Sequence, residues 1–418
     1  MNKKIFFRLD WLSILLYLLL VSFGLVNIYS SGFSNTTILF WDPDYLVGKQ
    51  FWIFIACLII LPLILAVKSN FFEHLTYIFY GISIFSLLGL FIFGETISGA
   101  TSWYSLGSFS LQPSEFAKIT TAMVVALNLG SFQNDLKKNT HLLKIISLVS
   151  LPMLLIILQP DAGSALVFMG IFFVLIREGL NLKFLFLAIG LLLIFFLTLL
   201  FSPLNLSLVM GFIFLIIYNL IKRRYPKTKK SPFILTLIIG IVFSYSVSLI
   251  FNTVFEQRHR DRFNIILGLE TDSRGIGYNI NQSKIAIGSG GFSGKGFLNG
   301  SQTKGNFVPE QETDYIFSIV GEEWGFLGSV TLILLFVILI FRIIYKAERH
   351  SSAYARVFSY TFASMLFVHF FVNIGMTLGL VPTVGIPLPF ISYGGSNLLA
   401  FSLMLFIYLS FDANRLDY

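Results

Sequence analysis

The chain has 418 residues, of which 56% are hydrophobic and only 12% are charged, and its mean hydropathy is +0.82. Soluble domains carry about 25% charged residues, so this composition excludes a soluble globular protein. The formal net charge is +8. Most of this charge is explained by membrane topology, as described next, and we expect no nucleic-acid partner.

Apolar runs recur along the chain, and each has about the length needed to cross roughly 30 Å of hydrocarbon. They predict an all-α, polytopic membrane bundle of about twelve transmembrane helices, forming a single domain over residues 1–418. The expected spans are 11–30, 50–67, 74–93, 114–131, 143–159, 163–177, 183–201, 204–221, 233–254, 314–341, 357–379 and 397–412.

Lysine and arginine are distributed unevenly over the connections between these spans. If the connections alternate between the two sides, 20 of the 29 basic residues lie on the same side as the N-terminus. The positive-inside rule then places both termini in the cytoplasm. The single cysteine, Cys57, lies in an apolar span and excludes an intramolecular disulfide.

One polar segment, 256–323, interrupts this apolar pattern. The segment 256–323 contains nine of the 21 acidic residues and seven basic residues. We expect residues 255–313 to form a large connection between two spans, and the topology places this connection on the outer side. Its cations therefore oppose the usual charge bias, which indicates a functional surface. The basic residues are Arg258, Arg260, Arg262, Arg274, Lys284, Lys295 and Lys304.

The segment 99–118 ends in QPSEFAK. Pro113 predicts a helix start there, and Glu115 and Lys118 would then lie one turn apart, close enough to pair. One interpretation is a helix cap with a local ion pair. The other is that both side chains face a polar cavity, because ionisable groups within spans are costly and usually functional.

Two further segments are rich in glycine and proline. In QPDAGSA, 159–165, Asp161 can cap the next helix. The segment 380–397 has three prolines and three glycines and cannot form one regular helix. Irregular backbone at membrane depth is tolerated where it lines a cavity, so we expect a cavity wall, with Ser392 and Ser396 as candidate substrate-binding hydroxyls.

Arg258, Arg260 and Arg262 alternate in EQRHRDR. Guanidinium groups match the oxygens of a phosphate, so these residues are candidates for binding one; a solvated surface patch is the alternative. The run AIGSGGFSGKG, which contains Lys295, does not match a nucleotide-binding phosphate loop. We expect its glycines to let the backbone approach a ligand closely.

Asp314 lies at the start of a long apolar span, in PEQETDYIF. It could be only an N-terminal cap. Alternatively, the nearby charges of Glu310 and Glu312 would raise a carboxyl pKa and suit Asp314 to proton transfer. Glu322 is eight residues further on, roughly 12 Å along a helix and about 80° around it, so we expect it to have a structural role rather than to pair with Asp314.

These segments together resemble the SEDS family of bacterial cell-shape and division proteins, the RodA type more than the FtsW type. The matching blocks are GA-x-x-W with QPSE-x-AK (99–118), QPD-x-G (159–163), GYNINQSKIAIGSGGFSGKG (277–296), PE-x-x-TDYIF-x-x-x-GEE-x-G (309–325) and NIGM-x-x-GL-x-P-x-x-GIPLPFISYGGS (373–396). They cover nearly the whole chain in order.

The resemblance implies a peptidoglycan glycosyltransferase that polymerises lipid II at the outer face of the cytoplasmic membrane, for cell elongation and rod shape. It also implies a class B penicillin-binding protein as partner, with Asp314 as the catalytic residue and Glu115 and Lys118 lining the same cavity. The chain departs from the family at Ser102, where an arginine is usual, and at 266–269, where ILGL replaces FLDP and Asp272 is the nearest acidic residue.

The resemblance implies about ten spans, whereas the sequence predicts twelve. The two additional spans predict a helical hairpin inserted near 203–232. For the chemistry, Asp314 would act as general base on a sugar hydroxyl, in an inverting single displacement. Charge on the leaving pyrophosphate would be stabilised by cations or by a divalent cation, magnesium or manganese. The candidate cations are Arg258, Arg260, Arg262, Lys118 and Lys295.

Two other functions remain open at this point. A transporter that flips lipid II would need polar residues through the whole membrane thickness, whereas here they gather at one side. His369 is the clearest ionisable residue in mid-span, and we expect it to be satisfied between helices. A scaffold that only recruits the transpeptidase would need no acidic and basic cavity.

Overall fold

The computed structural model describes residues 8–33, 39–97, 99–107, 109–131, 136, 138–225, 230–253, 255, 257–269 and 276–415. The chain is almost entirely helical and divides into two compact units. Unit 1 comprises residues 1–179 and 278–418, and unit 2 comprises residues 180–277.

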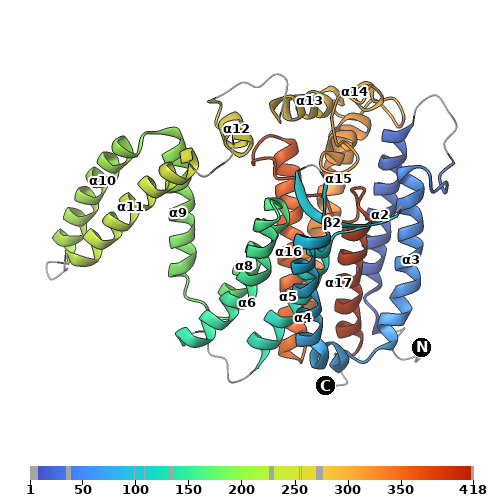
Figure 1. Ribbon diagram of the computed structural model, residues 1–418, viewed down its shortest axis with the longest axis horizontal. Coiled ribbons are helices and arrows are strands. Elements are labelled where there is room, and N and C mark those ends of the chain that lie inside the picture. Colours follow the sequence, from blue (N-terminus) through green and yellow to red (C-terminus); the bar gives the residue numbers. More distant parts are fainter. Residues whose placement is uncertain are drawn as a thin grey trace. The chain divides into compact units, whose positions relative to one another are not determined.

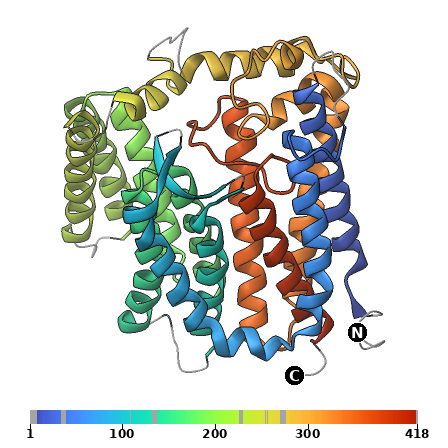
Figure 2. The same ribbon diagram turned by 45° about the vertical axis from the view of Figure 1, so that its right-hand side comes forward.

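Unit 1 is a bundle of long helices (Figure 1). Both ends of the chain lie at one end of this bundle, and α13 and α14 lie at the opposite end (Figures 1 and 2). We call these the terminal end and the far end. The helices are α2 (Trp11–Gly32), α3 (Leu46–Ala66), α4 (Ser69–Phe93), α5 (Pro113–Gly130), α6 (Asn139–Leu158), α7 (Ala162–Val167) continued by η1 (Phe168–Gly170) and α8 (Ile171–Arg177), α13 (Ile276–Ser289), α14 (Ser301–Lys304), α15 (Ile316–Ala347), α16 (Ala353–Thr377) and α17 (Gly395–Ala413).

Unit 2 contains α9 (Lys183–Leu200), α10 (Pro203–Arg224), α11 (Ser231–Thr253) and α12 (Gln257–Ile266). Within it, Phe263 of α12 packs edge-on against Phe195 of α9 and Phe251 of α11. The predicted large connection 255–313 is therefore not a plain loop, because it holds α12, α13 and α14.

The expected spans match the observed helices. Among the described residues, ten helices are long and apolar enough to cross a membrane. The two remaining expected spans correspond to α5 and to the run α7–η1–α8, which forms a shorter apolar helix over Ala162–Arg177. In hydrocarbon every backbone amide and carbonyl needs an internal partner, and a helix supplies one within a single segment. The chain is thus a multi-pass membrane protein.

A small antiparallel sheet precedes α5 and was not predicted. Its strands are β1 (Glu95–Ile97), β2 (Ala100–Leu106) and β3 (Phe109–Leu111), in the order β1-β2-β3. Pro113 follows as the first residue of α5, as predicted, where the missing amide hydrogen costs nothing. The predicted cap at Asp161 is confirmed, because its Oδ1 accepts from the Ser164 amide at 2.9 Å.

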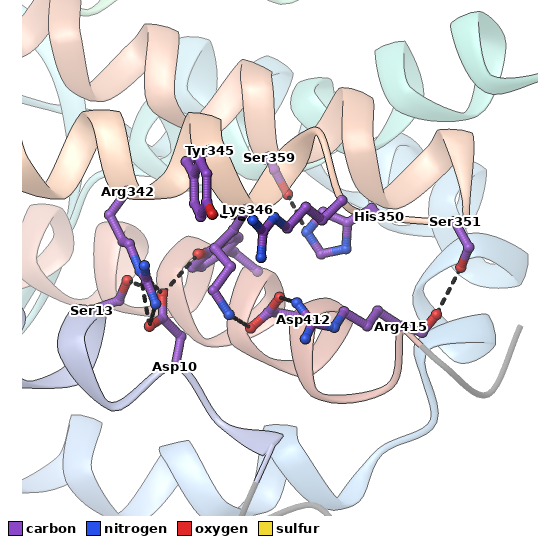
Figure 3. Close-up of polar contacts among 12 residues, drawn as sticks. Asp10, Ser13, Arg342, Tyr345, Lys346, His350, Ser351, Ser359, Asp412 and Arg415 are labelled. Atoms are coloured by element: carbon purple, nitrogen blue, oxygen red, sulfur yellow. Dashed lines mark hydrogen bonds and ion pairs between the residues drawn. The ribbon is translucent and has the colours of Figure 1, made fainter.

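Charged side chains from three helices meet at the terminal end of unit 1 (Figure 3). Both Asp10 and Asp412 are buried, and each accepts hydrogen bonds from cations of α15. The pairs are Arg342 Nη2 with Asp10 Oδ1 at 2.8 Å and Lys346 Nζ with Asp412 Oδ2 at 2.8 Å. We call this group the terminal cluster; it comprises Asp10, Ser13, Arg342, Lys346, Tyr408, Asp412 and Arg415.

Candidate functional site

Asp314 lies in a turn just before α15 rather than at the helix cap. The amides of Thr313, Asp314 and Tyr315 all donate to the carbonyl of Glu310, at 3.1–3.2 Å. The N-cap residue of α15 is Tyr315, whose own side chain makes no cap hydrogen bond. Asp314 thus precedes the N-cap residue of α15 by one position, and the choice between a capping and a catalytic role stays a prediction. Its side chain is partly exposed, unlike the buried residues that follow it in α15.

The irregular segment 378–394 passes beside this turn. As predicted, it is not a regular helix, since α16 ends at Thr377 and α17 begins at Gly395. Gly385 has a φ of +68°, and a Cβ there would lie 3.3 Å from Oδ2 of Asp314. The carboxylate therefore lies against the backbone of this segment. The Tyr393 amide also donates to the carbonyl of Glu312, at 2.8 Å.

Burial raises the pKa of Glu312 above its ordinary value, and the nearby charge of Glu310 raises it further. The expected crowding of acidic groups before α15 is therefore present, and it acts on the carboxyl of Glu312. The turn 310–315 thus carries two partly exposed acids, Glu312 and Asp314.

Glu115 and Lys118 form the predicted pair, with 2.7 Å between Lys118 Nζ and Glu115 Oε1. Both side chains are almost completely buried. Lys118 Nζ also lies 2.9 Å from His369 Nε2, and Glu115 Oε2 accepts from Asn397 at 3.0 Å. The two charges are thus satisfied inside the bundle, and their contacts join α5 to α16 and α17. The predicted contact of this pair with a substrate cavity stays a prediction.

His369 has both ring nitrogens in use, which confirms the expected interhelical role. Nδ1 lies 3.0 Å from the Pro387 carbonyl, which can only accept, so Nδ1 carries the hydrogen. Nε2 is then the acceptor for the Lys118 ammonium. The edge of the His369 ring packs on Phe401, with ring centroids 4.8 Å apart.

The two candidate serines are engaged with the backbone. Ser392 Oγ accepts from the Leu388 amide at 2.8 Å, and Ser396 Oγ accepts from the Gln112 amide at 3.0 Å. Both residues are buried. They hold the 388–396 backbone in shape, and a contact with substrate remains a prediction.

Lys295 is paired with Glu322, with 2.7 Å between Nζ and Oε1. Glu322 also accepts from the amides of Gln302 and Thr303, at 2.9 and 2.8 Å. This confirms the expected structural role of Glu322, which fixes the 295–304 segment on α15. The positive charge of Lys295 is therefore balanced within the protein.

The glycine-rich run approaches the backbone of α15 closely. The amides of Lys295 and Gly296 donate to the carbonyls of Glu322 and Glu323, each at 3.0 Å. An approach of this run to a ligand stays a prediction. The glycines in the sequence predict a close approach of this run to another group, but they do not show that the group is the backbone of α15.

The predicted phosphate-binding arginines belong to unit 2. Arg260 Nη1 donates to the carbonyl of Asn252 at 3.3 Å, at the end of α11. A cavity of about 300 Å³ in unit 2 is lined by Arg260, Asn252, Gln257 and Asn264 among others. The side chain of Arg258, and all of Asp272 and Arg274, lie outside the described residues.

Comparison with known proteins identifies the family. The family model described as cell cycle protein, for the FtsW, RodA and SpoVE proteins, matches residues 10–214 and 228–415. The chain belongs to this family. The two matched ranges are interrupted only at 215–227, and the insertion near 203–232 stays a prediction.

Within this family the RodA type is favoured, as predicted. The chain is 34% identical to a peptidoglycan glycosyltransferase RodA of Treponema pallidum, covering 97% of this chain and 98% of the relative. It is 32% identical to the peptidoglycan glycosyltransferase MrdB of Escherichia coli K12, covering 86% and 83%. A probable FtsW of Enterococcus hirae is 28% identical over 99% of this chain and 94% of its own length.

A solved structure confirms the fold. A chain from a structure described as a peptidoglycan synthase complex that coordinates polymerization and crosslinking matches with a TM-score of 0.72 and 25% identity. The match covers 97% of this chain and 99% of that chain.

Proposed function

We propose that this family member is a peptidoglycan glycosyltransferase of the RodA type, which polymerises lipid II into glycan strands for cell elongation and rod shape. The named activities of its relatives support this. The structural observation that carries the proposal is Asp314, a partly exposed carboxylate held against an irregular backbone segment at the far end of unit 1.

Asp314 is the proposed general base. A sugar hydroxyl is a poor nucleophile, and a carboxylate within hydrogen-bond reach can take its proton as the new glycosidic bond forms. The hydroxyl oxygen attacks the anomeric carbon of the donor sugar, the bond from that carbon to the pyrophosphate breaks, and the pyrophosphate leaves with the electron pair. One displacement inverts the anomeric carbon, and no covalent sugar adduct forms on the protein.

The negative charge on the leaving pyrophosphate needs a partner. Lys118 and Lys295 already neutralise Glu115 and Glu322, so they are weaker candidates than the sequence suggested. From the sequence, Arg258, Arg260 and Arg262 stay candidates, because guanidinium groups can bind phosphate oxygens bidentately. Arg260 and Arg262 are the two whose side chains are described.

A divalent cation is the other candidate for this charge. In the described part of the chain, no group of three His, Cys, Asp or Glu side chains is arranged to hold a metal ion. The protein residues described do not form a cation site by themselves, and we derive no step that depends on one. Magnesium or manganese would need oxygen ligands from the substrate.

The proposal extends to location and partner. We infer that the protein lies in the cytoplasmic membrane of a bacterium, with both termini inside and the far end facing outward, in line with its distribution of lysine and arginine. A class B penicillin-binding protein would cross-link the product, a partnership consistent with the similar chain in a peptidoglycan synthase complex.

The terminal cluster favours a polymerase over a transporter. A transporter that flips lipid II must open at both ends of its path. Here two buried carboxylates at the terminal end of unit 1, Asp10 before α2 and Asp412 of α17, pair with cations of α15, and separating buried charges from their partners is costly. A scaffold without activity would not require the carboxylate arrangement around Asp314.

The test is polymerisation of fluorescent lipid II by the purified protein, alone and with its transpeptidase. We expect glycan ladders from the native chain and a loss of about 10²–10⁴-fold in rate for Asp314→Asn and Asp314→Ala. Glu310→Gln removes an acid from the same turn and is the matched control, with ladders retained. Thermal melts of all variants report folding.

Each other outcome has a clear meaning. If both Asp314 variants polymerise at the native rate, Asp314 is not the base. If the native chain makes no glycan even with the transpeptidase, the polymerase proposal fails, and a lipid-scrambling assay in liposomes then tests transport. Capture of a sugar covalently attached to the protein would contradict single displacement.

A further inference from the structure

Asn373 connects the turn that holds Asp314 to the irregular segment 378–394. It lies in α16 and is completely buried. Its Nδ2 donates to the carbonyl of Asp314 at 2.8 Å and to the carbonyl of Ile386 at 2.7 Å. One side-chain amide thus binds two backbone positions that are 72 residues apart in the sequence.

The orientation of this amide is fixed by its surroundings. Both neighbours are carbonyl oxygens, which only accept hydrogen bonds, so the amide must present its two N–H groups to them. Oδ1 points away and has no hydrogen-bond partner despite being buried. A buried acceptor without a partner is costly, so this orientation keeps the two donated hydrogen bonds and leaves Oδ1 without one.

The residue one turn earlier on α16 makes a parallel contact. His369 Nδ1 donates to the carbonyl of Pro387, adjacent to Ile386, at 3.0 Å. The other ring nitrogen binds Lys118, whose partner is Glu115. The same face of α16 therefore fixes two consecutive carbonyls of the irregular segment and connects them to the buried ion pair on α5.

The contacts of Asn373 determine where the Asp314 carboxylate lies. Ile386 follows Gly385, and a Cβ on Gly385 would lie 3.3 Å from Asp314 Oδ2. A shift of the 385–387 backbone relative to the turn would therefore change the space around that oxygen. The Asn373 amide binds both sides of this junction.

We infer that Asn373 is a positioning residue for the glycosyl transfer, which holds the Asp314 turn and the 385–387 backbone in one fixed geometry. This inference rests on the proposed function of Asp314. Misplacement of a reacting group by about 1 Å can cost about 10²-fold in rate, so loss of the two hydrogen bonds lowers kcat without removing the carboxylate.

The test compares Asn373→Leu and Asn373→Asp with Asn128→Asp. Leucine keeps the approximate volume and removes both donors, and aspartate keeps the shape but turns oxygens toward two carbonyls. Asn128 is a buried asparagine of α5 that donates to the Val124 carbonyl and to Tyr77, away from the Asp314 turn. Asn128→Asp therefore reports how much stability and activity are lost when any buried side-chain amide is changed.

Three measurements are made on each folded variant. Initial polymerisation rates at varied lipid II give kcat and KM separately, and we expect kcat to fall about 10–100-fold in both Asn373 variants, with a much smaller change in KM. The acid limb of the rate against pH is expected to shift, because the environment of Asp314 changes. Hydrogen exchange is expected to speed up together in 310–316 and 381–394, and in neither segment for Asn128→Asp.

The exchange measurement separates the two proposals, because it needs no polymerisation. The native chain could prove inactive while Asn373→Leu still speeds up exchange in both segments. In that case Asn373 does connect the two segments, and only its role in catalysis is contradicted. If Asn373→Leu keeps the native kcat, or if it loses activity only in proportion to the unfolded fraction, the positioning role is overturned.

A second variant covers the case in which neither Asn373 variant folds. Gly385→Ala keeps both hydrogen bonds of Asn373 and adds a methyl group close to Asp314 Oδ2, at a φ of +68° that favours glycine. We expect a reduced kcat with unchanged exchange in 310–316. A native kcat in Gly385→Ala would contradict the claim that this backbone determines the position of the carboxylate.

Discussion

At the terminal end of unit 1, Asp10 and Asp412 pair with cations of α15, and each partner is a side chain on or beside a regular helix. At the far end, the turn before α15 and the segment 378–394 are held instead through backbone carbonyls and amides. Within a regular helix the backbone amides and carbonyls bond to one another, so contacts between such helices are made by side chains. Irregular backbone leaves carbonyls that other groups must satisfy.

This difference bears on the proposal that the chemistry takes place at the far end. In the terminal cluster the carboxylates of Asp10 and Asp412 are buried and neutralised by cations of α15. At the far end, hydrogen bonds to backbone carbonyls hold the Asp314 turn and the segment 378–394. The predictions below test the two ends separately.

The largest effect is expected from Asp412→Asn at the terminal end. It leaves the buried Lys346 ammonium without its carboxylate partner, and breaking one side of a buried pair costs about 3–5 kcal/mol. We expect a fall in melting temperature on the order of 10 °C, with an unchanged polymerisation rate per folded molecule. Thermal melts and rates measured well below the transition check both expectations.

Two further variants make this prediction specific. In the double variant Asp412→Asn/Lys346→Met both charges are gone, and the loss of stability should be smaller than for Asp412→Asn alone. Glu348→Gln breaks the exposed pair with Arg177 and should cost about 1 kcal/mol or less. A loss of activity at full folding in Asp412→Asn would show that the two ends are not independent.

Gly325→Ala is the next test, at the far end. Gly325 has φ +62° and ψ −156°, a region open almost only to glycine, and it breaks the helical geometry of α15. A Cβ there would lie 2.2 Å from the Gly294 nitrogen. We expect a cost of about 1–3 kcal/mol from backbone strain, and faster hydrogen exchange over 290–304 as that segment moves off α15.

Gly81→Ala is the matched control for this change. Gly81 lies inside α4, and nothing lies within 4 Å of an added Cβ. Alanine is favoured over glycine in a helix by about 1 kcal/mol, so the control should be slightly more stable than the native chain. Native exchange over 290–304 in Gly325→Ala would mean that the close approach is not needed to hold the segment.

The sequence predicted the contacts that are local in the chain. Glu115 and Lys118 are three residues apart on one helix, and Asp161 caps the helix that begins after it; both follow from helix geometry alone. The lengths of the apolar runs predicted the spans, because each span also lies within one continuous stretch of the chain. The strands of residues 95–111 were missed, since β1 and β3 have only three residues each, too few to show an alternating pattern.

The contacts that define the candidate site are long-range, and the sequence could not predict them. Asn373 binds positions 59 and 13 residues away, and His369 binds Lys118 at a separation of 251 residues. One signal was available: His369 and Asn373 are polar, lie four residues apart in an apolar span, and therefore share a face of the helix. That pattern predicts a buried polar contact but does not name its partners.

The smallest effect is a dependence of stability on pH, and its sign should differ between the two ends. Burial would raise the pKa of Asp10, but hydrogen bonds from Arg342 and Ser13 lower it below its ordinary value. Its contribution to stability is then present at neutral pH and is lost as the pH falls through the native pKa. The cost of Asp10→Asn should therefore shrink only in strong acid, below about pH 4.

Glu312 should behave in the opposite way, because burial and the charge of Glu310 raise its pKa. The native state then holds this proton more tightly than the unfolded chain, whose glutamates titrate near about 4.3. Stability is favoured below that value and is lost as the pH rises through the raised native pKa. Glu312→Gln removes the ionisation, so its melting temperature should exceed the native one by about 1–3 °C at pH 8 and equal it near pH 4. Melts from pH 4 to 8 check this; a constant difference, or one that grows toward acid, would show that the far end does not disfavour this partly buried charge.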